Sequence, residues 1–323
     1  MAIVSLLNLT EADKLSGSEV IPVNQCGTTK RLPVSAISGG GENSETNGTQ
    51  AIVLAGCNNK ALSSFGVVVQ GCNNSATSSI FNTVLNGLDN NNLSIGYGTI
   101  IGGRCHLIAG CNNNNKFSTI LNGQNNKICA GCGSLLGGLS NTINTPGNKN
   151  NIILGGDSAS ILQSNIASSC NIILAGTNFS CDNTGTVIGS GMINIIRRSG
   201  DSFIGAGSFN QVLSSSCSFI GTGLGNNITS GERNIIVGGS SNSILSGSNG
   251  GILGGLNNGL SGNNSFIIGT GIKGCGDCTT FVNKLSATCS IHAGNGFTGT
   301  VTISSNAGDK SMVITDGIIT GLS

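Results

Sequence analysis

Thirteen cysteines are the residues with the most reactive side chains in this chain of 323, and four of them form two Cys-x-x-Cys pairs. The pairs are Cys129/Cys132 and Cys275/Cys278, and this spacing allows two thiolates to bind one zinc ion. The pairs lie far apart, and only two histidines are present to complete a ligand set. We therefore expect no metal or other cofactor, and free structural thiols acting as small buried hydrophobic residues in a reducing cytosol. Cys275 and Cys278 are the pair to consider as metal ligands, because the glycines in Lys-Gly-Cys-Gly-Asp-Cys permit a tight turn.

Carboxylates are the second group that could do chemistry, since glycoside cleavage uses a pair of them. Between residues 50 and 271 they are few and widely separated: Asp89, Asp157, Asp182, Asp201 and Glu232. We expect them to lie in turns with structural roles, as we do the basic doublet Arg197-Arg198. The sequence 294–299 matches Gly-x-Gly-x-x-Gly, but a strand-like run follows where a dinucleotide site needs a helix. We predict no catalytic or cofactor-binding residue and no enzymatic activity.

Charge and hydropathy exclude two kinds of partner. The net charge is +1 and only 8% of residues are charged, so there is no basic surface for nucleic acid. No stretch approaches the roughly 18 consecutive apolar residues that a membrane span needs. The start, Met-Ala-Ile-Val-Ser-Leu-Leu, has no cationic flank and is soon followed by Glu11, unlike a secretory signal. We expect synthesis in a cytoplasm.

Internal periodicity indicates which elements must position these residues. Glycine makes up 53 of 323 residues, and fourteen of these glycines each close a short apolar run. Spacing between the last six is 16 residues, and the earlier spacings range from 15 to 20. We call them anchor glycines: Gly56, Gly71, Gly87, Gly103, Gly123, Gly138, Gly156, Gly176, Gly191, Gly207, Gly223, Gly239, Gly255 and Gly271.

Two further columns keep a fixed offset from the anchors. Three residues before each anchor is a core residue, β-branched in thirteen of fourteen cases and suited to a strand: Val53, Val68, Val84, Ile100, Ile120, Leu135, Ile153, Ile173, Ile188, Ile204, Ile220, Ile236, Ile252 and Ile268. Three residues after the anchor is an asparagine column, in which His106 stands as a hydrogen-bonding substitute: Asn59, Asn74, Asn90, Asn126, Asn141, Asn194, Asn210, Asn226, Asn242 and Asn258. Asparagine tolerates left-handed backbone, and stacked amides can bond to one another in a ladder.

A second apolar position follows the asparagine, so each unit predicts a strand, a glycine turn and a second strand. The fold class is therefore all-β, a solenoid or β-roll with coils of about 16 residues and two short strands per coil. Runs such as Asn-Ile-Ile-Val-Gly (234–238) place apolar side chains on both faces of one strand. Because alternation is expected where one face meets water, we expect the outer face to contact another chain. Fourteen coils at strand spacing would give a rod of roughly 65–70 Å.

The repeat resembles the trimeric β-roll heads of YadA-like adhesins, whose units carry Ser-x-x-Ile-Gly elements. The counterparts here are Asp-Ser-Phe-Ile-Gly-Ala-Gly (201–207), Cys-Ser-Phe-Ile-Gly-Thr-Gly (217–223) and Asn-Ser-Phe-Ile-Ile-Gly-Thr-Gly (264–271). The resemblance covers about residues 50–271 and implies a parallel homotrimer. Neither an export signal nor a C-terminal membrane barrel like theirs is recognised in the sequence, so we expect no bacterial surface anchor of that kind.

The two ends differ from the repeat. Residues 1–38 predict one or two helical turns capped by Thr10 and then a hairpin, with strands over 18–23 and 30–34. This string is similar to the N-terminal segment of tailed-phage fibre and appendage proteins, which implies attachment to another virion protein. Residues 39–49 read as a flexible linker, 50–272 as the repeat rod, and 273–323 as a C-terminal β cap or a receptor-binding tip.

These observations lead to one functional hypothesis and two alternatives. We expect a non-enzymatic, homotrimeric fibre or appendage of a tailed-phage virion, made in the host cytoplasm and able to present a host-contact surface to a receptor. A cellular trimeric adhesin or surface filament is the first alternative. A polysaccharide-degrading tailspike is the second, disfavoured by the 16-residue period and the missing carboxylate pairs.

Overall fold

The computed structural model describes residues 20–25, 28–33, 43–77, 80–94, 96–109, 117–162, 170–284, 299–305, 308–315 and 318–322. The chain forms two units, one ending at Asn283 and one beginning at Lys284. Throughout the described ranges every regular element is a β-strand. No helix of these ranges is long and apolar enough to cross a membrane.

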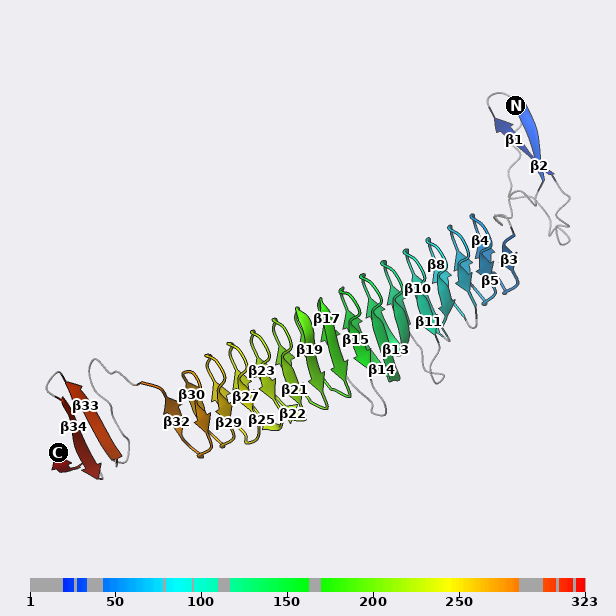
Figure 1. Cartoon of the computed structure of the whole chain (residues 1–323). Helices are drawn as coiled ribbons and strands as arrows, with labels where there is room; N and C mark the ends of the chain where they lie inside the picture. The colour runs from blue at the N-terminus through cyan, green and yellow to red at the C-terminus, as the bar shows by residue number, and fades with distance from the viewer. Residues whose placement is uncertain are drawn as a thin grey trace. The chain divides into compact units, whose positions relative to one another are not determined.

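The first unit contains a parallel β-solenoid of about 14 turns, built on a sheet of 28 strands (Figure 1). Each turn adds one strand to each of two parallel ladders, which confirms the prediction of two strands per coil. The first ladder holds the strands before the turn glycines: β4 (Ile52–Val53), β6 (Val67–Val68), β8 (Thr83–Val84), β10 (Tyr97–Ile100), β12 (Phe117–Ile120), the ends of β13 (Lys127–Leu135) and β14 (Thr142–Ile153), β16 (Ile172–Ile173), β18 (Val187–Ile188), β20 (Phe203–Ile204), β23 (Phe219–Ile220), β26 (Ile235–Ile236), β28 (Gly251–Ile252), β30 (Phe266–Ile268) and β32 (Thr280–Val282).

The second ladder holds the strands that follow the asparagine column. They are β3 (Glu45–Thr46), β5 (Lys60–Ala61), β7 (Ser75–Ala76), β9 (Asn91–Leu93), β11 (Leu107–Ala109), the starts of β13 and β14, β15 (Ser160–Leu162), β17 (Thr177–Cys181), β19 (Met192–Arg197), β21 (Gln211–Leu213), β24 (Asn227–Ile228), β27 (Ser243–Ile244), β29 (Gly259–Leu260) and β31 (Lys273–Gly274). A separate pair, β22 (Ser215–Ser216) and β25 (Gly231–Glu232), lies at a turn.

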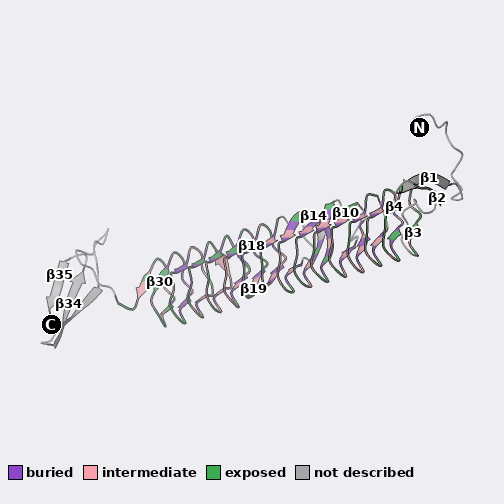
Figure 2. Cartoon of the chain, turned by 90° about the horizontal axis from the view of Figure 1, so that it is seen from above, coloured by how far each residue is buried: buried purple, intermediate pink, exposed green. Residues whose placement is uncertain are grey.

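The core is a thin layer between the two ladders. Ile236 of β26 pairs in register with Ile220 and Ile252 of the coils on either side, and all three are fully buried. Ile228 and Ile244 of the second ladder belong to the same buried cluster. Buried and outward residues alternate along most of the strands (Figure 2), because successive side chains of a strand point to opposite faces.

Turn glycines set the close approach of successive coils. Gly239 has a φ of +90°, and a Cβ added to it would lie 2.1 Å from the carbonyl oxygen of Gly255 in the next coil. A side chain is therefore excluded twice, by the left-handed backbone and by the neighbouring coil. This explains why glycine recurs at these positions when so many other positions vary.

The last repeat departs from the spacing predicted from the sequence. Ile267 pairs with Ile252 and is buried, whereas Ile268 is 49% exposed, so the assignment of Ile268 to the core was wrong. Gly269 takes the place expected for Gly271, since its carbonyl meets the position of a Cβ on Gly255. The adjacent Ile-Ile and the two nearby glycines in 264–271 allow either register by sequence alone. Strands β3, β31 and β32 join the ladders outside residues 50–272, so the stack runs from Glu45 to Val282.

Short antiparallel elements are described in both terminal regions. β1 (Val20–Gln25) and β2 (Thr28–Pro33) form the N-terminal hairpin that the sequence predicts. The predicted helical turns near Thr10 lie outside the described residues. In the second unit, β33 (Gly299–Ser305), β34 (Gly308–Thr315) and β35 (Ile318–Leu322) form a three-stranded antiparallel sheet.

Candidate interaction surfaces

The asparagine column connects each coil to the next through buried amides. The Oδ1 of Asn226 accepts the backbone N–H of Asn242 at 3.1 Å, and its Nδ2 donates to the carbonyls of Thr222 and Gly239, each at 3.1 Å. Its own N–H donates to Oδ1 of Asn210 at 3.0 Å. All members of the column are fully buried. Within the described column, amide-to-amide bonds join Asn194 to Asn178 and Asn210 to Asn194, each at 3.1 Å. Asn178, two residues after Gly176, takes the column position in its coil, where its Oδ1 accepts the N–H of Asn194.

His106 takes one place in this column and fulfils only part of the asparagine's role. Its backbone N–H donates to Oδ1 of Asn90 at 3.0 Å, and its Nδ1 accepts the N–H of Asn126 at 3.2 Å. That bond assigns the imidazole proton to Nε2, which makes no hydrogen bond of normal geometry in the described coils. Burial lowers the pKa of His106, and backbone groups of Gly123 and Asn126 partly offset this effect.

The described cysteines lie at outward and turn positions; seven are free as expected, but the expectation that the thiols are buried was wrong, and three cysteines are bonded. Cys57 and Cys72 form a disulfide between adjacent coils, with their Cα atoms 4.7 Å apart. In-register coils place equivalent turn residues at one strand spacing, which falls within the range that a disulfide bridges. Cys129 is also disulfide-bonded. The free thiols of the described residues are exposed or half-buried: Cys105, Cys132, Cys170, Cys181, Cys217, Cys275 and Cys278.

Neither Cys-x-x-Cys pair is part of a metal cluster in the described residues. Cys132 is free while Cys129 is bonded elsewhere, so these two do not act as a pair. Cys275 and Cys278 are both exposed in the turn between β31 and β32. Across the described ranges, no group of three or more His, Cys, Asp or Glu side chains could hold a metal ion.

The five acidic residues between positions 50 and 271 lie in five different coils, and the contacts of Asp89, Asp157 and Glu232 are local. Asp89 accepts a hydrogen bond from Asn73 Nδ2 at 2.9 Å, and Asp157 accepts one from the Ser158 hydroxyl at 3.0 Å. Exposed Glu232 pairs at 3.3 Å with the neighbouring Arg233. Asp182 raises the pKa of the Cys181 thiol, although burial is the larger cause and Arg197 and Arg198 oppose it. Residues 294–298 of the Gly-x-Gly-x-x-Gly match lie outside the described residues.

A continuous apolar face covers the outer side of the first ladder. On each strand, the residues flanking the buried core position point outward, and none of them is charged from Ile52 to Ile268. Many of these side chains are substantially exposed in the single chain: Ile52, Leu54, Leu85, Ile101, Leu136, Leu154, Leu174, Phe203, Phe219, Ile235, Val237, Leu253, Phe266 and Ile268. Monomeric proteins seldom expose an apolar patch of this extent.

Phenylalanine rings lie beside two of the glycines on this face. A Cβ added to Gly205 would lie 3.3 Å from Cε1 of Phe203, and one added to Gly221 would lie 3.3 Å from Cε1 of Phe219. The two rings stack at a centroid distance of 5.4 Å. The two rings therefore cover part of the face where the outer column has glycine at 205 and 221.

An aromatic column widens the apolar face in the N-terminal half of the stack. Phe65, Phe81, Tyr97 and Phe117 stack one above another with centroids 4.8, 5.1 and 5.0 Å apart and planes within 11° of parallel. In β10 and β12 the aromatic residue points to the same side as the threonine two positions later, so the column belongs to the first-ladder face. Sequence analysis missed this column, although its spacings of 16, 16 and 20 residues equal the coil lengths there.

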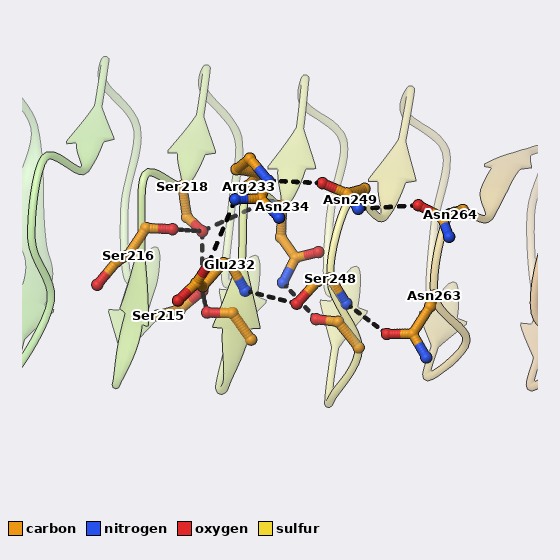
Figure 3. A network of polar contacts seen from close by, with 12 residues as sticks. Ser215, Ser216, Ser218, Glu232, Arg233, Asn234, Ser248, Asn249, Asn263 and Asn264 are labelled. Atoms are coloured by element: carbon orange, nitrogen blue, oxygen red, sulfur yellow. Dashed lines mark hydrogen bonds and ion pairs between the residues drawn. The ribbon is translucent and has the colours of Figure 1, made fainter.

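The same corner becomes polar in the later coils. We define the polar corner as Glu232, Arg233, Ser248, Asn249, Asn263 and Asn264 (Figure 3). Arg233 Nε donates to Asn249 Oδ1 at 2.7 Å, and Asn249 Nδ2 donates to Asn264 Oδ1 at 2.8 Å. Beneath it, buried Ser218 and Asn234 form a second polar column in which Asn234 binds the N–H of Gly250 at 2.8 Å. The corner offers exposed amide, hydroxyl and charged groups at one strand spacing.

The outer side of the second ladder is mixed in character. Lys60, Lys127, Arg197 and Lys273 all stand on it and are exposed, and Arg198 follows Arg197 into an exposed turn. The two outer surfaces of the solenoid are therefore unlike: the first is uncharged and largely apolar, and the second is mixed and carries the exposed charged side chains.

Comparisons with protein-family models, with curated proteins and with solved structures found no match to this chain.

Proposed function

We propose that the chain is a non-enzymatic structural fibre or appendage of a tailed-phage virion, assembled as a parallel homotrimer. Its N-terminal residues 1–38 attach it to another virion protein, the solenoid forms the projecting rod, and its free surface is available to a receptor on the host. The resemblances of residues 1–38 and of the repeat support this assignment, and the geometry described above supports a role built on contact.

The observation that carries the proposal is the uncharged apolar face of the first ladder. In a solenoid, the two ladders pair the backbone hydrogen-bonding groups, and the inward side chains pack to form the hydrophobic core. The outward isoleucines, leucines and phenylalanines belong neither to the backbone ladders nor to the buried core of a single chain. Covering them removes apolar surface from water, which is the main source of favourable free energy in association. A self-assembling rod uses this face; an isolated binding module would not need it.

A host receptor would bind the surface that remains exposed after assembly. The polar corner presents groups that can form hydrogen bonds with a receptor, and it is held in place by bonds between adjacent coils. Arg233 and Asn264 are both exposed there. This corner is the candidate receptor-contact region of the fibre.

Deletion of residues 1–38 tests the virion role. Phage particles are prepared from cells that supply either the full chain or the truncated chain, and the protein is measured in purified particles. We expect the truncated chain to fold and assemble yet to be missing from the particles, while a full-length Arg233→Ala control is incorporated. Normal incorporation of the truncated chain would count against attachment through this segment. Release of sugar from host capsule by the purified protein would overturn the non-enzymatic assignment.

A further inference from the structure

The aromatic column and the outward side of β6, β8, β10 and β12 form one surface, which we call the aromatic face. We propose that the aromatic face is the principal contact between copies of this chain, and that Tyr97 is buried there in the assembled rod. This inference rests on the proposed self-assembly and names the surface and the partner that carry it.

The width of the apolar surface singles out these coils. Between Phe65 and Leu121 three outward columns are present in each coil, the aromatic column, a Val/Thr column and a Val/Leu/Ile column. In later coils the first of these columns contains Asp201, Cys217, Arg233 and Asn249 in place of aromatic residues. The apolar contact is thus widest in the N-terminal half, and aromatic anchors dominate the binding energy of many interfaces.

The aromatic rings are positioned before any partner arrives. Phe65 and Phe81 sit in left-handed turns with φ of 55° and 59°, and stacking holds the four rings within 11° of parallel. Such rings lose little conformational entropy on binding. In the single chain Tyr97 is 47% exposed and Phe117 is 61% exposed, so substantial aromatic surface remains to be covered.

The shape and charge of this surface select a second copy of the chain as its occupant. Because no charged residue stands in the three columns between Phe65 and Leu121, a complementary partner surface is also uncharged. The columns repeat at the strand spacing, and a parallel second copy presents the same repeat over the same length. Over all fourteen coils, the two-column outer side of the first ladder measures on the order of 650 Å², and the aromatic column extends it to about 800 Å², roughly what one partner contributes to a stable interface. The aromatic face is the widest part of this surface, on the order of 300 Å².

Tyr97 provides a direct readout, since the chain has one tyrosine and no tryptophan. Tyrosine fluorescence of the full chain therefore comes from the middle of the aromatic face. We expect its quenching by acrylamide to be several-fold weaker in the assembled protein than for free N-acetyl-tyrosinamide. The mass of each sample is measured by light scattering on the same preparation.

Two substitutions provide the matched comparison. Phe81→Lys places a charge within the aromatic face, whereas Phe209→Lys changes an exposed phenylalanine at a turn outside it. We expect Phe81→Lys to lower the mass toward that of one chain and to expose Tyr97 to quencher, and Phe209→Lys to change neither. Circular dichroism verifies that both variants fold. If Phe81→Lys does not fold, the quenching of the wild-type protein still shows whether Tyr97 is buried in the assembly.

The outcomes separate this inference from the proposed function. A multimeric wild-type protein whose Tyr97 is quenched as readily as the free amide would overturn the aromatic face as the contact, while leaving self-assembly intact. A wild-type protein with the mass of one chain would overturn both.

Discussion

Buried asparagines connect the coils at the scale of single residues. Each column amide offers one acceptor and two donors, and the geometry at Asn226 uses all three, two of them toward the next coil. A buried hydrogen bond contributes only modestly, but leaving its partners unpaired is costly. The column therefore matters mainly because removing an amide would leave buried backbone groups of the coils without hydrogen-bond partners.

Replacement of Asn226 by alanine tests this reasoning. The change leaves the N–H of Asn242 and the carbonyl of Thr222 without their side-chain partner, while the carbonyl of Gly239 keeps the N–H of Leu224, so we expect the free energy of unfolding to fall by about 2–4 kcal/mol. Asn227→Ala is the control, because this neighbour points outward and its Oδ1 has no partner in the described structure. Chemical denaturation measures both; equal effects would contradict a special role for the column.

The buried His106 is expected to make the stability of the solenoid depend on pH. Its Nδ1 accepts the N–H of Asn126, and protonation would turn that acceptor into a donor facing another donor. The nearest charged residues along the coils, Asp89, Arg104 and Lys127, occupy outward or turn positions, and the lowered pKa has no charge–charge cause. Because the folded pKa is lowered, the unfolded chain binds more protons as the pH falls below about 6.5.

Stability should therefore be complete above that pH and decrease as the pH falls toward the folded pKa of His106. We expect His106→Asn to remove this part of the pH dependence between pH 7.5 and 5.5, since an amide does not titrate in this range. His292→Asn serves as the control for the second histidine. Denaturation midpoints across this pH range provide the measurement, and unchanged pH dependence in His106→Asn would contradict the account.

Glycine turns determine coil spacing at the scale of the element. Gly239→Ala places a methyl group against the Gly255 carbonyl in a left-handed turn, so we expect a loss of more than about 2 kcal/mol or failure to fold. Gly137→Ala is the matched control, since a Cβ there meets nothing within 4 Å and its φ lies outside the left-handed region. Thermal unfolding followed by circular dichroism compares them, and tolerance of both would show that the coils can shift apart.

The period and the two-strand coil could be predicted from the sequence because the inward positions obey strict rules. Val84, Ile153 and Ile236 are buried where the anchor spacing places them. The error at Ile268 arose where two isoleucines and two glycines lie side by side, so that only pairing with Ile252 decides the register. The bond between Cys57 and Cys72 was missed because composition indicates the redox compartment, whereas pairing depends on coils lying in register. The aromatic column escaped notice because outward positions were not aligned between repeats.

At the scale of the whole molecule, the solenoid has two unlike outer surfaces. The outer side of the first ladder carries no charge, and that of the second carries exposed lysine and arginine. The ladders and the core stabilise the single chain, and neither requires the two outer surfaces to differ in charge. The asymmetry is explained if the first-ladder face is covered by other copies and the charged face meets solvent.

Paired substitutions on one strand separate folding from assembly. Ile236→Ala removes a buried core side chain and should cost about 2–5 kcal/mol of unfolding free energy. Ile235→Lys, one residue earlier, points outward and should leave the secondary structure intact while weakening association. Denaturation and sedimentation on both variants give the comparison. Association unaffected by Ile235→Lys would place the contact away from the first-ladder face.

The most direct test of the central claim is the solution mass of the full chain, measured by light scattering behind a sizing column. The account predicts an elongated particle with about three times the single-chain mass of 32.2 kDa. A folded particle with the mass of one chain would show that the apolar face stays in water, and would contradict the self-assembling fibre.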